Sequence, residues 1–177
     1  MSTIEPVPLI DVIVEAPQWD TASGAEATVR RALSEAAIAI GTDFKDRVLA
    51  VLLTDDAAIR RLNAQWRGID KPTNVLSFPP APNAGEQMAA VISLGDIAIA
   101  YETTAREAKT EDKPFDHHLA HLAVHGFLHL LGYDHEADAA ANTMEQLERV
   151  ILARLGVPDP YLTHETVAPH ALQAGRS

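Results

Sequence analysis

Three histidines in the last third of the chain have the spacing of a metal site. His125, His129 and His135 follow the pattern H-x3-H-x5-H, and Gly132 stands between the second and the third. Residues four apart on an α-helix share one face, so the first two imidazoles can reach one ion. A glycine at 132 can adopt a positive φ, end the helix and bring His135 to the same ion. The segment therefore predicts a three-histidine metal site.

The number and type of these ligands favour a catalytic zinc ion. Three protein nitrogens leave a fourth coordination position open, as catalytic rather than structural zinc sites do. The chain contains no cysteine, so histidine and carboxylate are the strong ligands that remain. Imidazole also binds copper, nickel and iron, and zinc is the favoured identity among these. We expect a metal-dependent hydrolase that holds one Zn²⁺ ion.

Position 126 separates this chain from a class of zinc metalloproteases with the same ligand spacing. Those enzymes have the motif H-E-x-x-H, in which the glutamate is the general base. Here the corresponding residue is Gly126. Peptide hydrolysis by that mechanism would lack its base, so the same ligands are expected to serve a different reaction.

Other residues near the motif are candidates for supporting roles. His118 and His121 fall on the same helical face as the first two ligands, and we expect them to line the site or support a ligand. Asp96 and Asp134 could orient a ligand histidine or water, although a structural role at a strand end or turn is favoured. The remaining histidines are expected at the surface: His117, His164 and His170.

Arg67 is the side chain that could bind a phosphate group. It ends a predicted helix and precedes a turn that leads into an apolar segment ending at Phe78. A planar guanidinium can bind two phosphate oxygens at once. The ordinary alternative is a solvated arginine that interacts with the dipole at a helix C-terminus. The residues alone leave both interpretations open.

The hydrophobic pattern predicts strands and helices in one domain over residues 1–162, followed by a frayed tail at 163–177. The continuous apolar run Arg47–Thr54 indicates a central strand. The other strands are expected at 9–15, 74–78 and 92–100. A loop rich in proline follows residue 78. Helices are expected at 21–40, 55–67, 101–111, 114–131 and 137–155, the last with Met144, Leu147, Val150 and Ile151 on its apolar side.

The overall charge narrows the classes of partner. Fourteen basic and 25 acidic side chains give a net charge of −11, which disfavours a broad nucleic-acid-binding surface. A divalent ion could still form one positive cleft on an acidic body, together with basic residues that are close in sequence: Arg60, Arg61, Arg67 and Lys71. The first 17 residues lack the features of a signal peptide, and no apolar run approaches the roughly 18 to 20 residues of a membrane span. We expect a cytoplasmic protein with no membrane partner.

Taken together, the motifs resemble the YbeY family of bacterial rRNA maturation factors, which are zinc-dependent endoribonucleases. The resemblance rests on the histidine segment, on the run from Arg67 to Phe78, and on Leu94-Gly95-Asp96-Ile97, and it covers roughly residues 46–161. It implies a single α+β domain with a four-stranded mixed sheet and about five helices. It also implies a zinc site in a cleft formed by the histidine helix and the turn that follows.

The same resemblance implies a function. Members cleave single-stranded RNA and act in 16S rRNA 3′-end maturation and in ribosome assembly and quality control. Carried onto this chain, His125, His129 and His135 would bind zinc, and Arg67 would bind the phosphate. The implied partners are single-stranded RNA, the small-subunit rRNA precursor, and small-subunit proteins and assembly factors.

Several alternatives stay open at this point. Within the nuclease interpretation, the attacking group could be a water molecule or the 2′-hydroxyl of the RNA. A ribosome-assembly factor with a mainly structural zinc would need a closed fourth ligand. A metal-dependent hydrolase of another substrate, peptide included, would use the same open site, and a peptide substrate would require a carboxylate in place of Gly126.

Overall fold

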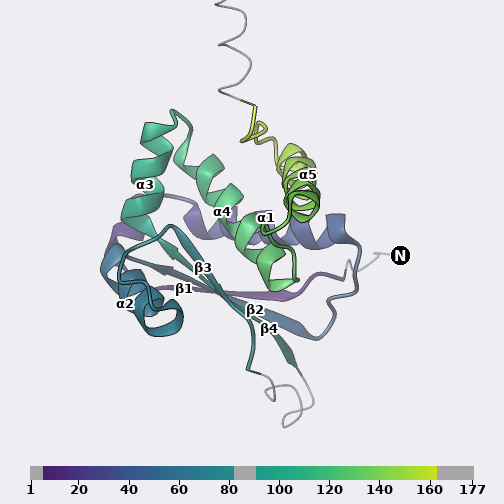
Figure 1. Ribbon diagram of the computed structural model, residues 1–177, viewed down its shortest axis with the longest axis horizontal. Helices are drawn as coiled ribbons and strands as arrows, with labels where there is room; N and C mark the ends of the chain where they lie inside the picture. The colour runs from purple at the N-terminus through teal and green to yellow at the C-terminus, as the bar shows by residue number, and fades with distance from the viewer. Residues whose placement is uncertain (1–5, 82–90, 163–177) are drawn as a thin grey trace, which may run out of the picture.

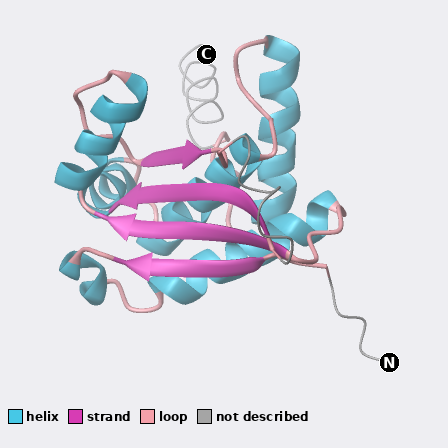
Figure 2. Cartoon of the chain, turned by 90° about the horizontal axis from the view of Figure 1, so that it is seen from below, coloured by secondary structure: helices cyan, strands magenta, loops and turns pink. Residues whose placement is uncertain are grey.

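In the computed structural model, which describes residues 6–81 and 91–162, four strands form one sheet in the order β1-β2-β4-β3. The first three strands in this order run parallel, and β3 pairs antiparallel with β4 at one edge. Figure 2 shows the β3 arrow pointing against the others. The four-stranded mixed sheet and the central place of β2 are confirmed. The strands are β1 (Leu9–Val14), β2 (Arg47–Thr54), β3 (Val75–Phe78) and β4 (Ile92–Ala100).

Helices cover the two faces of the sheet unequally. Figure 1 shows α1, α4 and α5 above the sheet, whereas α2 lies below it. The first helix begins four residues later than predicted, because Pro17–Thr21 forms a separate 3₁₀ turn. The other predicted helices are confirmed to within two residues at each end. Within the described ranges the α-helices are α1 (Ala25–Ile40), α2 (Asp56–Arg67), α3 (Tyr101–Thr110), α4 (Phe115–Leu130) and α5 (Asp138–Arg154).

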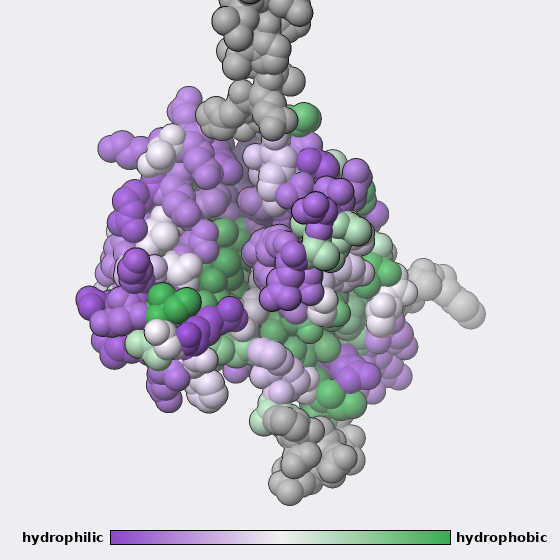
Figure 3. Space-filling view, in the orientation of Figure 1, coloured by the Kyte–Doolittle hydropathy of each residue, from purple (hydrophilic) through white to green (hydrophobic). Residues whose placement is uncertain are grey.

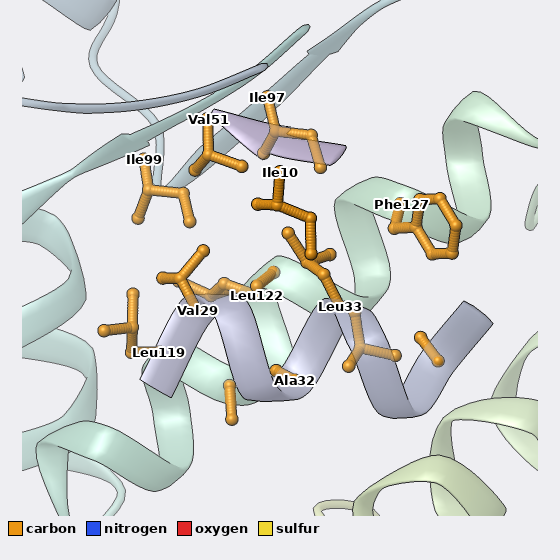
Figure 4. Packing of buried hydrophobic residues seen from close by; sticks show 14 of the residues in the cluster. Ile10, Val29, Ala32, Leu33, Val51, Ile97, Ile99, Leu119, Leu122 and Phe127 are labelled. Atoms are coloured by element: carbon orange, nitrogen blue, oxygen red, sulfur yellow. The ribbon is translucent and has the colours of Figure 1, made fainter. Parts of the chain in front are cut away.

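The main core lies between the sheet and the pair α1 and α4. Alternate residues of the central strands face these helices, as Val51 and Ile97 show in Figure 4. Leu33 of α1 and Phe127 of α4 are completely buried in the same cluster. Each such side chain contributes roughly 1.5–3 kcal/mol when it is removed from water. The helix that carries two of the predicted ligands is thus anchored along its apolar sides.

Polar side chains lie mostly outside this core. Hydrophilic residues predominate in the upper part of the face in Figure 3, and hydrophobic residues gather toward its centre. Among the described residues, Glu148 of α5 is the one carboxylate that is fully buried.

No helix within 6–81 and 91–162 is long and apolar enough to cross a membrane. The predicted tail at 163–177, with His164 and His170, and most of the proline-rich loop lie outside the described residues.

Candidate metal centre

The turn after α4 brings the third histidine back toward the helix. The helix ends at Leu130, and Gly132 takes a φ of 97°. Its N–H bonds the carbonyl of His129 at 3.0 Å, and the N–H of Tyr133 bonds the carbonyl of Leu128 at 3.1 Å. These bonds satisfy carbonyls that the helix end leaves without partners. The predicted stop by a left-handed glycine is confirmed.

The structure brings the three predicted ligands together. The Nε2 atoms of His125 and His129 lie 3.1 Å apart, and His135 Nε2 lies 3.1 Å from His129 Nε2 and 3.2 Å from His125 Nε2. The ring centroids are farther apart, at 4.6–4.9 Å, so the rings converge through these nitrogens. A tetrahedral zinc ion at its usual Zn–N distance separates two ligand nitrogens by about 3.3 Å. The cluster therefore has the dimensions of a three-nitrogen zinc site.

The protonation of the rings also suits a cation. A glutamate accepts from His125 Nδ1 at 2.5 Å, which leaves the lone pair on Nε2. Burial, together with the neighbouring rings of His125 and His135, holds the pKa of His129 below its ordinary value. The bond to the glutamate therefore directs a lone pair of His125 into the cluster, and the lowered pKa favours the neutral, metal-binding form of His129. The ligand role of the three residues stays a prediction that this geometry supports.

Glu148 is the glutamate that contacts His125, and the sequence interpretation did not single it out. Its Oε1 accepts from His125 Nδ1, and its Oε2 accepts from His121 Nε2 at 3.2 Å and from the hydroxyl of Tyr161. Burial alone would raise the pKa of this carboxyl, but the hydrogen bonds from His121, His125 and Tyr161 outweigh it and hold the pKa well below the usual range. The side chain is therefore a carboxylate inside the core.

The helical spacing of the sequence could have indicated that Glu148 is buried. The predicted apolar side of the last helix included Val150, but this residue is 54% exposed, and that assignment is wrong. The buried stripe runs instead through Met144, Glu148 and Ile151, which are spaced at i, i+4 and i+7. A charged residue on the apolar stripe of a helix marks a buried carboxylate that needs partners.

His118 and His121 both lie on α4, but only His121 contacts a residue that is bonded to a predicted ligand. His118 is buried, its Nε2 lies 3.1 Å from Glu107 Oε1, and burial lowers its pKa. His121 contacts Glu148 and belongs to a second group of possible metal-binding residues with Glu148 and His125. Neither ring enters the three-nitrogen cluster. His117 is partly exposed at the surface.

Arg67 lies at the end of α2, where the sequence predicts it, and reaches the free edge of the sheet. Its Nη2 donates to the backbone carbonyl of Ser77 at 3.0 Å. The hydroxyl of Ser77 in turn donates to the carbonyl of Gly126 at 2.8 Å, next to the predicted ligand His125. No acidic side chain of the described residues forms an ion pair with Arg67. The guanidinium thus lies at β3 without a carboxylate that would compete with a phosphate.

Gly126 has a packing role in addition to its place in the motif. A Cβ atom built there would lie 3.1 Å from Ile97 Cγ2 and 3.2 Å from both Ser77 Oγ and Val75 Cγ2. The position therefore faces β3 and β4 and has little room for a side chain. The structure gives a steric reason for the missing glutamate of the protease motif.

The two aspartates that could have oriented a ligand do not do so. Asp96 is exposed, and its side chain shares the face of Ala98 and Ala100, which pack on the α2 side of the sheet. Asp134 Oδ1 accepts from the backbone N–H of Glu136 at 3.2 Å within the turn. The favoured structural interpretation fits Asp134, whereas Asp96 lies in the middle of β4 rather than at a strand end.

The fold and the site together define an α+β domain with a three-histidine candidate metal centre on one helix and its terminal turn. The family described as Endoribonuclease YbeY matches residues 14–156, and the chain belongs to this family. The predicted resemblance to this family is thereby confirmed. The match also begins earlier than residue 46, where the resemblance was expected to start.

Relatives in other bacteria match over most of their length. An endoribonuclease YbeY of Nitrobacter hamburgensis is 58% identical over 169 residues, which cover 92% of this chain and 86% of the relative. Two proteins of the same name from Rhodopseudomonas palustris strains BisA53 and BisB18 are 61% and 60% identical. They cover 87% and 90% of this chain and 90% and 96% of their own lengths.

Proposed function

We propose that this protein is a zinc-dependent endoribonuclease that hydrolyses phosphodiester bonds in single-stranded RNA. The observation that carries the proposal is the convergence of three Nε2 atoms at 3.1–3.2 Å in a chain that belongs to the Endoribonuclease YbeY family. The names of its relatives support RNA as the substrate.

The three histidines would hold the ion, and the surrounding residues suit a catalytic site. His125, His129 and His135 supply three nitrogens, and no fourth protein ligand of the described residues joins their group. A zinc ion held in this way supplies Lewis acidity and activates water. The open position favours catalysis over the alternative of a structural zinc in an assembly factor, which would need a fourth ligand.

Arg67 is proposed to bind the phosphate that is cleaved. Its hydrogen bond to the Ser77 carbonyl uses one nitrogen and holds the guanidinium at the β3 edge. The remaining N–H groups can donate to non-bridging oxygens and neutralise the charge that grows on them during cleavage. On a chain with a net charge of −11, this guanidinium and the ion would form a local positive site.

The biological substrate that we propose is the small-subunit rRNA precursor. Processing of its 16S 3′ end, with a part in ribosome assembly and quality control, agrees with the family of the chain. Small-subunit proteins and assembly factors are the proposed partners, and the cytoplasm is the proposed location. The acidic surface suits basic ribosomal proteins.

A hydrolase of peptides is a weaker candidate. The position that would carry the general base is Gly126, which faces the sheet rather than open space. A side chain at this position would be directed toward β3 and β4. This observation favours the phosphodiester over the peptide bond.

The test combines metal analysis with cleavage of a labelled single-stranded RNA. His125→Ala is expected to lose both metal and activity, whereas Arg67→Ala is expected to keep the metal and lose activity. Arg31→Ala, at an exposed position of α1, is the control and should behave as wild type. Full activity in metal-free protein, or in both site variants, would contradict the proposal.

A second substrate separates the two attacking groups. RNA with a single 2′-deoxyribose at the cut site should still be cleaved if water attacks phosphorus. The same RNA should resist cleavage if the neighbouring 2′-hydroxyl is the nucleophile.

A further inference from the structure

We propose that Glu148 is a positioning residue of the metal centre, and that Tyr161 and His121 hold Glu148 in place. The segment after α5 would then be a working part of the site, although it is remote in sequence from the ligands. This inference rests on the proposed metal centre and deepens it. Under this proposal Glu148 would touch neither the ion nor the RNA and would act through His125.

The two carboxylate oxygens of Glu148 have different hydrogen-bond partners. Oε1 accepts the bond from His125 Nδ1 at 2.5 Å. Oε2 accepts from His121 Nε2 at 3.2 Å and from the Tyr161 hydroxyl. One oxygen therefore orients the ligand, and the other is fixed by two donors that are not ligands.

The bond to His125 decides which nitrogen is available to a metal. A proton on Nδ1 that is donated to a carboxylate leaves the Nε2 lone pair free and raises its basicity. The same bond fixes the rotation of the ring, so that Nε2 points into the three-nitrogen cluster. Without the carboxylate, the ring could take the other tautomer or rotate away.

The buried carboxylate depends on its three donors. Glu148 is fully buried, and an unpaired charge inside a protein costs several kcal/mol. Loss of any one donor would weaken the arrangement that holds the other two. Tyr161 and His121 therefore influence His125 without touching it.

Tyr161 is itself held against α5. Its backbone N–H donates to Asp159 Oδ1 at 2.8 Å, and Asp159 forms an ion pair with Arg149 at 3.0 Å. The guanidinium of Arg149 lies 5.2 Å from the centre of the Tyr161 ring. The ring also packs edge-on to His121, with centroids 5.8 Å apart. These contacts place the hydroxyl over the carboxylate.

A second ion among His121, His125 and Glu148 is the competing explanation. The ligand atoms of these residues lie within 4.8 Å of one another. An ion about 2.0–2.2 Å from each atom would hold a nitrogen and an oxygen about 3.3 Å apart in tetrahedral geometry. The 2.5 Å separation of His125 Nδ1 and Glu148 Oε1 is that of a hydrogen bond. The geometry points to one ion per chain.

The experiment measures zinc affinity and stoichiometry by competition with a chromophoric chelator, for wild type, Glu148→Gln and Tyr161→Phe. Loss of such an outer partner costs 10- to 100-fold in metal affinity, and we expect about this loss for Glu148→Gln. Tyr161→Phe removes one donor of three and is expected to lose a smaller factor. The absorption spectrum of bound Co²⁺ should change in both variants, because the orientation of a ligand ring changes.

Matched controls separate this role from a general loss of packing. Glu107→Gln breaks a similar contact, 3.1 Å long, with His118, which is not a predicted ligand. Tyr101→Phe removes a hydroxyl that bonds Thr21 far from the site. Both controls should bind zinc as wild type does. If Glu148→Gln does not fold, Tyr161→Phe decides, with thermal unfolding as the check on its fold.

Three results would overturn the inference. The first is wild-type zinc affinity in a folded Glu148→Gln or, if that variant does not fold, in Tyr161→Phe. The second is two ions per wild-type chain, one of which is lost in Glu148→Gln, since this would show a second metal site instead. The third is a wild-type protein that binds no zinc, which would overturn the proposed function as well. Zinc binding by wild type with unchanged variants would overturn this inference alone.

Discussion

Replacement of Gly126 tests whether the close contact between α4 and the sheet excludes a side chain. A Cβ at this position would lie within 3.1–3.2 Å of Ile97, Ser77 and Val75. The isoleucine and the valine are β-branched strand residues with restricted side-chain rotation, so they cannot move away freely. We therefore expect any larger residue at 126 to push α4 from β3.

The magnitude depends on the residue introduced. For Gly126→Ala, overpacking costs about 1–3 kcal/mol, and the higher helix propensity of alanine returns about 1 kcal/mol. The net loss of about 0–2 kcal/mol corresponds to a decrease in Tm of up to about 8 °C for a chain of this size. Gly126→Glu adds an unpaired buried carboxylate, so a loss of more than about 4 kcal/mol is expected. Its Tm should fall by at least about 8 °C.

Thermal unfolding followed by circular dichroism measures this effect. Ala27→Glu, at an exposed position of α1, is the control and should change the free energy of unfolding by no more than about 0.5 kcal/mol. Gly126→Glu restores the H-E-x-x-H pattern in sequence, yet it should confer no peptide hydrolysis, because the position faces β3 and β4. An unchanged Tm for Gly126→Glu, or a gain of peptidase activity, would refute this reasoning.

Three further predictions concern the ion, the arginine and pH. Removal of zinc by a chelator should lower Tm by about 5–11 °C, because a ligand at 100 times its Kd contributes about 2.7 kcal/mol; an equal Tm with and without zinc would contradict this. Arg67→Lys should keep zinc but lose about 10²-fold in RNA cleavage, since an ammonium cannot bind two phosphate oxygens as a planar fork does; steady-state kinetics and metal analysis measure both. The pKa of His129 is lowered in the folded state. As the pH falls below about 6.5, the unfolded chain therefore binds more protons than the folded chain. The metal-free protein should for this reason lose stability between pH 7 and pH 5. His118, whose pKa is also lowered, contributes to the same effect. The free energy of unfolding in urea should therefore depend on pH less steeply in His129→Asn than in wild type, although some dependence should remain. An identical dependence on pH would contradict the role of His129.

The part of the site that could be predicted from the sequence consists of residues that are close to one another in the chain. His125, His129 and Gly132 belong to one helix and its end, and helix periodicity alone places them. The fold was predictable for a similar reason, because the apolar runs and helix stops of β2, α2 and α4 are strong local signals. The sequence motif thus contained all three residues of the proposed ligand set.

The rest depends on contacts between distant segments. Glu148 lies 23 residues beyond His125 and is buried only because α5 packs beside α4. The link from Arg67 through Ser77 to Gly126 spans an edge strand and a helix that no local pattern places together. The exposure of Val150 has the same cause. An amphipathic pattern predicts that a helix has a buried stripe, but contacts with other segments decide which residues belong to that stripe.

The predicted metal ligands and the proposed phosphate-binding arginine are held by different parts of the fold. All three predicted ligands lie within eleven residues of α4 and its turn, whereas the guanidinium of Arg67 is held by the edge strand β3. A small outward movement of β3 would change the distance from the guanidinium to the ion while the three nitrogens kept their spacing. A shift of this edge strand would therefore move the proposed phosphate-binding group and leave the proposed metal ligands in place.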